Sequence, residues 1–158
     1  MADPSDDLDS LRVVADYQFG AGAGKALFPP DEPLDIRRSR SGRPRQIRAE
    51  AGRIASFLTD GRLSLGAEGG RRLTAALSHP AYRVVVGDES EPYVREGRNV
   101  FAKFVAEVDP VVRPGDEVLV VHGDGRLLAV GRAELSADAM TDFGTGMAVM
   151  VREGILAE

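Results

Sequence analysis

The chain of 158 residues contains no cysteine. This absence excludes disulfide scaffolds and thiolate metal sites, and it is compatible with a reducing compartment. No apolar run approaches the roughly 20 residues that a membrane helix requires. The acidic residues 1–10 are the opposite of the basic start of a signal peptide. We therefore expect a cytoplasmic protein that makes no contact with a membrane.

Apolar residues make up 43% of the chain, which is enough for a hydrophobic core. A chain of this length holds one domain or two small ones. His79 and Pro80 end a predicted helix, because the residue before a proline disfavours helical geometry. We predict a disordered acidic tail at residues 1–10, a first domain at 11–79 and a second domain at 80–158.

The net charge of −5 argues at first against a nucleic-acid partner, but the charges are segregated. Residues 1–36 carry eight acidic and two basic side chains. Residues 37–75 carry three acidic and ten basic side chains, and residues 76–158 carry fourteen acidic and eight basic ones. The middle segment contains a basic stretch without any acidic residue, with six arginines: Arg37, Arg38, Arg40, Arg43, Arg45 and Arg48. Such a stretch favours phosphate binding with a steep salt dependence. Two alternatives remain open: the stretch is a solvated loop, or it pairs with the acidic residues at 3–9.

Turn residues and apolar periodicity predict the secondary structure of both domains. In the first domain we expect a strand at 11–19, a glycine-rich turn at 20–25, strands at 53–58 and 62–65 around Asp60–Gly61, and a helix at 67–78. In the second we expect strands at 82–86, 100–108, 117–121, 127–135 and 148–152, with short helices at 91–96 and 137–143. Short strands at this spacing are typical of a small barrel.

The second half resembles the PUA domain, a barrel named for pseudouridine synthases and archaeosine transglycosylases. Four segments carry the resemblance in order: YVREGRNVFAKFV at 93–105, VRPGDEVLVV at 112–121, LLAVGRA at 127–133 and GMAVMVREG at 146–154. The resemblance implies that RNA is held between the first helix, the following strand and the last strand. On these elements lie the candidate contacts Arg95, Gly97, Arg98, Asn99, Lys103 and Arg152. Gly97 is also the expected end of the helix.

The first half resembles the α+β domain that precedes the PUA domain in archaeal tRNA-guanine (archaeosine) transglycosylases. The matching segments are ADYQFGAGAGKALF at 15–28, SRSGRPRQI at 39–47 and ASFLTDGRLSL at 55–65. The resemblance implies that the catalytic aspartates of that family lie in a TIM barrel, which needs about 250 residues. Because this chain has no room for such a barrel, we expect no catalytic residue in it.

Other chemistry has little support. His79 and His122 are the only histidines, and without cysteines they make a poor metal site. The segment Gly20–Lys25 lacks the glycine at position 19 and the Ser or Thr at position 26 that a phosphate-binding loop requires. We therefore predict neither a metal nor a cofactor.

We predict an α+β fold, with a small α+β domain followed by a mixed PUA-type pseudo-barrel. The predicted function is non-catalytic binding of RNA, with tRNA or another structured RNA as the partner, in connection with RNA modification. In the basic stretch we select Arg40, Arg43 and Arg45 as phosphate contacts, the last two on one side of a strand. The alternative is a protein-interaction subunit that supplies the C-terminal half of a tRNA-modifying enzyme in trans.

Overall fold

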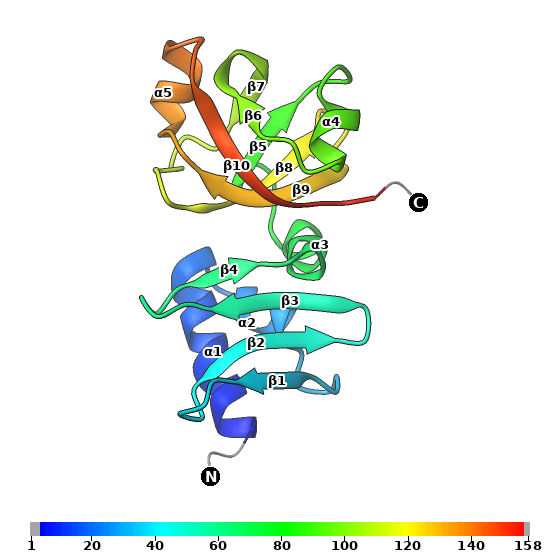
Figure 1. Cartoon of the computed structure of the whole chain (residues 1–158), viewed down its shortest axis with the longest axis vertical. Helices are drawn as coiled ribbons and strands as arrows, with labels where there is room; N and C mark the ends of the chain where they lie inside the picture. The colour runs from blue at the N-terminus through cyan, green and yellow to red at the C-terminus, as the bar shows by residue number, and fades with distance from the viewer. Residues whose placement is uncertain (1–3, 157–158) are drawn as a thin grey trace. The chain divides into compact units, whose positions relative to one another are not determined.

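A computed structural model describes residues 4–156 of the chain (Figure 1). The chain divides into two compact units between Leu77 and Ser78. No helix within the described residues combines the length and the hydropathy needed to cross a bilayer.

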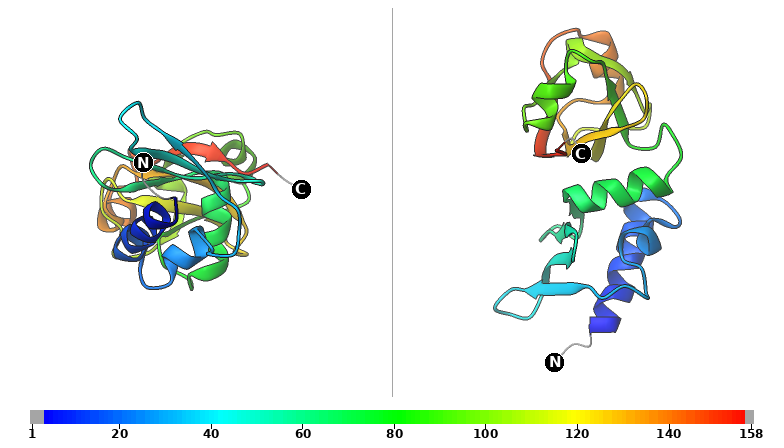
Figure 2. Two further views of the ribbon diagram at one scale, coloured as in Figure 1. Left: turned by 90° about the horizontal axis from the view of Figure 1, so that it is seen from below. Right: turned by 90° about the vertical axis from the view of Figure 1, so that its right-hand side faces the viewer.

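The first unit is an antiparallel sheet with helices on one of its faces (Figure 2). Its four strands are neighbours in chain order: β1 (Asp35–Arg38), β2 (Pro44–Ala49), β3 (Gly52–Phe57) and β4 (Leu63–Leu65). The three helices are α1 (Pro4–Phe19), α2 (Ala23–Leu27) and α3 (Ala67–Ala76). Between the sheet and the helices lies a core of fully buried side chains that includes Leu27, Phe28, Ile47, Leu65 and Leu73.

The N-terminal helix α1 corrects two predictions. Residues 4–10 are helical and not a disordered tail, and residues 11–19 continue the helix and are not a strand; residues 1–3 lie outside the described part. The buried residues Leu11, Ala15 and Phe19 recur every four positions, which is the period of a helix and not of a strand. Acidic side chains in the first turn stabilise the positive end of the helix dipole.

The second unit is a six-stranded mixed sheet that curls into a nearly closed pseudo-barrel (Figure 1). The strand order is β6-β10-β9-β8-β5-β7, and only β5 and β8 run parallel among these pairs. The strands are β5 (Arg83–Val86), β6 (Val100–Phe101), β7 (Val105–Val108), β8 (Glu117–His122), β9 (Leu127–Ala133) and β10 (Met147–Gly154). The helices are α4 (Glu91–Arg95), the 3₁₀ turn η1 (Ala102–Phe104) and α5 (Ala137–Asp142).

The predicted fold class, a small α+β unit followed by a mixed pseudo-barrel, is confirmed. One predicted strand, residues 100–108, is interrupted by η1 and becomes two short strands. No strand was predicted at β1, and β2 was expected only as the strand that would carry Arg43 and Arg45. The arginine-rich sequences of β1 and β2 lack the apolar alternation that marks a half-buried strand.

Candidate nucleic-acid interface

The end of helix α4 shapes the surface where contacts were predicted. Gly97 has φ of +97° and follows the last helical residues, where its N–H donates to the carbonyl of Val94. The N–H of Arg98 reaches back to the carbonyl of Tyr93. These two bonds form a Schellman motif, which requires a left-handed residue that glycine adopts without strain. Gly97 is therefore the predicted helix end, and it turns the chain toward β6.

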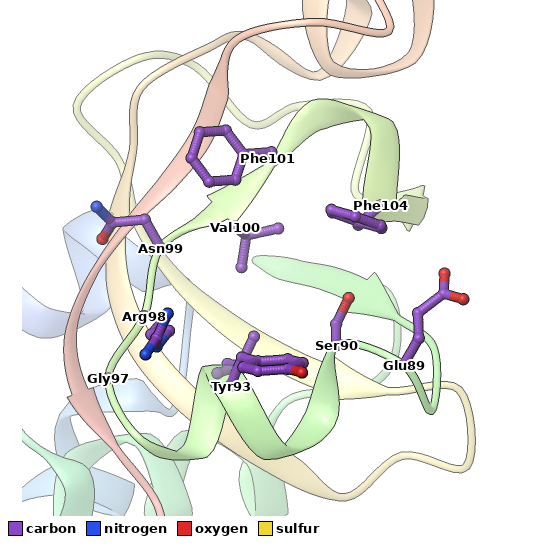
Figure 3. A pocket seen from close by; sticks show the side chains of 10 residues that line it. Glu89, Ser90, Tyr93, Gly97, Arg98, Asn99, Val100, Phe101 and Phe104 are labelled. Atoms are coloured by element: carbon purple, nitrogen blue, oxygen red, sulfur yellow. The ribbon is translucent and has the colours of Figure 1, made fainter.

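A hollow of about 740 Å³ lies beside this helix end (Figure 3). Its lining comes entirely from residues 89–104, which include the start and end of α4, strand β6 and the turn η1. Gly97, Arg98 and Asn99, three of the predicted contacts, line this hollow together. A Cβ at position 97 would meet no atom within 4 Å beyond the adjacent residues, so the backbone here is open to close approach.

Three aromatic side chains on this surface are half exposed. Tyr93 is 55% exposed, Phe101 47% and Phe104 37%, and all three line the hollow. The sequence analysis did not select them. Their alternation with basic residues in YVREGRNVFAKF was a usable signal, because aromatic side chains beside cations are typical of single-stranded nucleic-acid sites.

Cationic side chains lie over two of these rings. The guanidinium carbon of Arg98 is 5.7 Å from the centre of the Tyr93 ring, and Nζ of Lys103 is 5.1 Å from the centre of the Phe104 ring. Arg98 is 71% exposed and has only a long 4.0 Å contact with Glu96. Both cations therefore extend from the aromatic surface into solvent, where a phosphate can reach them.

Asn99 is oriented by the last strand. Its Oδ1 accepts a hydrogen bond of 2.9 Å from the N–H of Val151 in β10. The side-chain oxygen is thus engaged with the barrel, and the amide nitrogen is left to donate. Asn99 fits the predicted role of contacting a base edge or a 2′-hydroxyl, but as a donor.

Two predicted contacts are engaged within the fold. Arg95 is 14% exposed and donates from Nε to Glu91 and from Nη1 to the carbonyl of Ile155, at 2.9 and 2.8 Å. Arg152 forms a two-bond pair of 2.6 and 2.8 Å with Glu117, whose side chain is 6% exposed. The structure brings neither into the lining of the hollow. Arg95 instead ties α4 to the segment after β10, and Arg152 ties β10 to β8.

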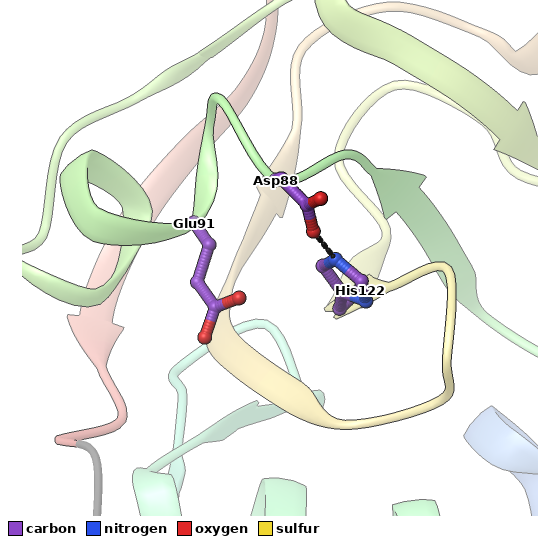
Figure 4. Close-up of side chains that lie close together, drawn as sticks. All are labelled: Asp88, Glu91 and His122. Atoms are coloured by element: carbon purple, nitrogen blue, oxygen red, sulfur yellow. Dashed lines mark hydrogen bonds and ion pairs between the residues drawn. The ribbon is translucent and has the colours of Figure 1, made fainter.

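On the other side of α4, Asp88, Glu91 and His122 form a cluster (Figure 4). One ligand atom from each lies within 4.8 Å of the others, which is a spacing that a metal ion can use. However, Glu91 accepts bonds of 2.7 and 2.9 Å from Arg126 and a further bond of 2.9 Å from Arg95. Two guanidinium groups on one carboxylate oppose a metal cation, so we assign the cluster to ion pairing.

Charges in and beside the cluster shift the pKa of three residues. Hydrogen bonds from Arg126 and Arg95 lower the pKa of Glu91 to about 2. The backbone N–H and the guanidinium of Arg126 lower the pKa of Asp124 to about 2. The hydrogen bond with Asp88, which outweighs desolvation, raises the pKa of His122 above 6.5. These charges attach the start of α4 to the β8–β9 hairpin and so hold one wall of the hollow in place.

The basic stretch of the first unit forms strands β1 and β2 and the turn between them. Arg38 is engaged with Asp7 at 2.6 Å, and Arg43 donates to the carbonyls of Phe57 and Leu58. The guanidinium of Arg43 also lies 4.5 Å from the centre of the Phe57 ring. Arg43 lies just before β2 and is turned toward β3, so it is not one of the outward-facing cations.

Arg40 and Arg45 are exposed, and their side chains make no hydrogen bond or ion pair with any of residues 4–156. The partly buried Arg48 also has no such partner in that part of the chain, and Arg37 is 64% exposed with a 3.7 Å contact to Asp35. The first unit therefore presents several cations to solvent, of which Arg40 and Arg45 are those that the sequence predicted.

Comparison with known families matches each unit separately. The family model for the patch-forming domain C2 of tRNA-guanine transglycosylase matches residues 9–80, and that for the PUA domain matches residues 82–155. The tRNA-guanine(15) transglycosylase of Methanothermobacter thermautotrophicus is 50% identical over 151 residues, which are 94% of this chain and 23% of that protein. The Thermococcus kodakarensis protein of the same name is 47% identical over 146 residues, or 92% and 25%. The chain thus spans about a quarter of the length of these relatives.

Solved structures share the fold. A hypothetical protein of Pyrococcus horikoshii OT3 has a TM-score of 0.69 at 21% identity, with 94% of this chain and 90% of that chain covered. A conserved PUA domain protein from Thermoplasma acidophilum has a TM-score of 0.61 at 21% identity, with 96% and 92% covered. The predicted resemblance is confirmed for both halves: the chain belongs to the proteins that join a patch-forming C2 domain of tRNA-guanine transglycosylase to a PUA domain, as in the C-terminal part of the archaeal enzymes.

Proposed function

We propose that the chain is a non-catalytic RNA-binding protein that binds tRNA or another structured RNA in connection with RNA modification. The observation that carries the proposal is the hollow of the PUA domain, where three half-exposed aromatic side chains stand beside the exposed cations Arg98 and Lys103. Aromatic surfaces of this kind stack on unpaired bases, and the neighbouring cations bind phosphates.

The first unit supplies a second attraction for RNA. Arg40 and Arg45 extend into solvent without an acidic partner in the described chain. Contacts of this type go to phosphates, carry no sequence information and depend strongly on salt. In the proposed division of work, the arginines of the first unit provide affinity, and the hollow of the PUA domain provides recognition.

The link to tRNA modification rests on the relatives. They are tRNA-guanine(15) transglycosylases, and the match covers more than nine tenths of this chain. In the one cluster of histidine and carboxylates found in residues 4–156, Glu91 is held by Arg126 and Arg95, and His122 is held by Asp88, so the proposal assigns these side chains to ion pairing and not to catalysis.

A binding titration tests the proposal. Fluorescence anisotropy of labelled total tRNA is measured against the protein at several salt concentrations, with Phe101→Ala as the test variant and Tyr17→Ala as the control. Tyr17 is 95% exposed in the first unit, so its removal tests for a general effect of losing an aromatic side chain. We expect tight binding at low salt, a loss of affinity with salt, and weaker binding only for Phe101→Ala. Absence of binding at low salt would refute the proposal.

A second candidate is that the chain works as a protein-interaction subunit with a tRNA-modifying enzyme. The observation that favours it is the identity of 50% with about a quarter of such an enzyme. In that case a separate protein corresponds to the rest of the enzyme, and this chain supplies its C-terminal half in trans. Copurification from lysate with and without RNase separates the two ideas. A partner that is retained after RNase supports the subunit, and a partner that is lost supports contact through RNA alone.

A further inference from the structure

The side chain of Arg38, in the basic stretch of the first unit, is held by a carboxylate. Arg38 is the last residue of β1, and its Nη2 donates a hydrogen bond of 2.6 Å to Oδ2 of Asp7 in α1. Its Nη1 donates to the carbonyl of Gly42, in the turn that follows β1, at 3.0 Å. The guanidinium is therefore fixed at the end of the strand, with a carboxylate oxygen on the side where an anion binds it.

The chain around Arg38 favours an anion. Residues 36–49 contain no acidic side chain. The turn after β1 adds the hydroxyls of Ser39 and Ser41, whose oxygens are 2.9 Å apart. Only one of these two hydroxyls can donate to the other, so the second is left to donate elsewhere. A phosphate oxygen carries the same charge as the Asp7 carboxylate and accepts from a guanidinium in the same way, so an RNA phosphate can take its place.

Asp7 lies on a part of α1 that is weakly held. The buried residues of α1 begin at Leu11, and none of residues 4–10 is buried. Few apolar contacts therefore hold the first turn, and helix ends of this kind open at low cost. The side chains of Arg38 and Asp7 are 25% and 20% exposed, so water reaches the ion pair. A surface pair changes an equilibrium by about 1.5- to 5-fold, which a phosphate contact can replace.

We propose that Arg38 and the turn after it form a phosphate site, that Asp7 occupies this site in the free protein, and that a backbone phosphate of the bound RNA displaces Asp7. The exchange breaks one ion pair of Arg38 and forms another. The Asp7 carboxylate returns to solvent, and the first turn of α1 loses its contact with β1. Asp7 is thus an internal competitor that lowers the affinity for RNA. This site rests on the proposed RNA binding and adds Arg38 to the residues that contact RNA.

Two variants of adjacent aspartates test the competition. Asp7→Asn removes the competing carboxylate. Asp6→Asn removes the same charge from an exposed residue whose side chain makes no hydrogen bond or ion pair with any of residues 4–156. Fluorescence anisotropy with labelled total tRNA, at about 100 mM salt so that surface charges are only partly screened, measures both affinities. We expect Asp7→Asn to bind about 1.5- to 5-fold more tightly than Asp6→Asn. Equal affinities would overturn the inference.

The same comparison in an Arg38→Gln background shows whether the effect depends on Arg38. Without the guanidinium there is no site for Asp7 to occupy, so the two aspartate variants should bind tRNA equally. A difference that persists in this background would show that Asp7 acts by another route, and the assignment of Arg38 would be wrong. Arg38→Gln alone should weaken binding, and an unchanged affinity would also overturn the site.

Hydrogen exchange of the unaltered chain provides a test without any substitution. The amides of residues 8–10 donate to carbonyls of the first turn of α1, so they report on its opening. When a phosphate displaces Asp7, the first turn loses its contact with β1, and these amides should exchange faster with saturating tRNA than without it. Unchanged or slower exchange at residues 8–10 would contradict the displacement.

The two proposals fail in different ways. If the parent chain binds no tRNA even at low salt, the RNA-binding proposal and the phosphate site fail together. If the parent binds with a salt dependence while Asp7→Asn and Asp6→Asn bind equally, only the phosphate site fails. Thermal melts check that the variants are folded. Should Arg38→Gln not fold, the hydrogen exchange of the unaltered chain decides.

Discussion

The arginines of the first unit divide into two groups that mutation can separate. Arg40→Gln combined with Arg45→Gln removes two cations that have no partner among residues 4–156. Each arginine that neutralises a phosphate contributes about 0.7–0.9 to the slope of log affinity against log salt. The double variant should therefore lower the slope by about 1.4–1.8. Its stability should stay within about 0.5 kcal/mol of the parent, because both positions are on the surface.

Arg43→Gln is the matched control, because the structure engages this arginine with the carbonyls of Phe57 and Leu58. Losing hydrogen bonds from a charged donor should cost about 2 kcal/mol of stability while the salt slope changes little. Fluorescence anisotropy with tRNA measures the salt slope between about 50 and 300 mM salt, the range where such contacts weaken. Urea denaturation measures the stability. A slope unchanged in the double variant, or lowered as much by Arg43→Gln, would show that the division is wrong.

Three further predictions concern the PUA domain. Gly154→Ala places a Cβ 2.0 Å from the carbonyl oxygen of Arg95, so α4 must move; we expect a loss of about 1–3 kcal/mol in urea denaturation and weaker RNA binding. The raised pKa of His122 means that its stabilising contribution is full below about pH 6.5 and is lost as pH rises through the folded-state value. Thermal melts at pH values from about 5 to 9, which bracket the titration of a histidine, measure this pH dependence. The His122→Asn variant should no longer show it. Arg152→Met removes the ion pair with the buried Glu117 carboxylate and should cost about 3 kcal/mol of stability, with RNA affinity of the folded fraction unchanged.

Much of the second unit could be predicted because its turns and strands have clear local signals. The pairs Gly115–Asp116 and Asp124–Gly125 lie at strand ends, and β8 and β9 are apolar enough to be read as buried strands. The first unit was harder. Helix α1 contains the β-branched pair Val13–Val14, which favours a strand locally, but the buried positions four residues apart prevail because they pack on the core.

The sequence predicted which elements form the candidate site more accurately than which side chains face it. Gly97, Arg98 and Asn99 lie together at the hollow, as their position on the helix end and the following strand indicated. The engagement of Arg95 and Arg152 depends on partners 60 and 35 residues away along the chain, Ile155 and Glu117. Such distant contacts leave no trace in a local pattern, so an arginine that holds the fold together looks the same as one that faces RNA.

The acid-rich composition of the second half is compatible with RNA binding where cations are concentrated on one surface. Glu91 accepts from Arg126 and Arg95, and Glu117 accepts from Arg152, so these carboxylates are neutralised within the domain. An anion that is already paired repels phosphate far less than a free one, because the two charges are seen together as a dipole. Each internal pair also occupies an arginine, so the sum of charges is unchanged, and attraction to RNA depends on where cations such as Arg98 extend outward. The relevant quantity is the charge that remains without a partner on the surface that RNA approaches.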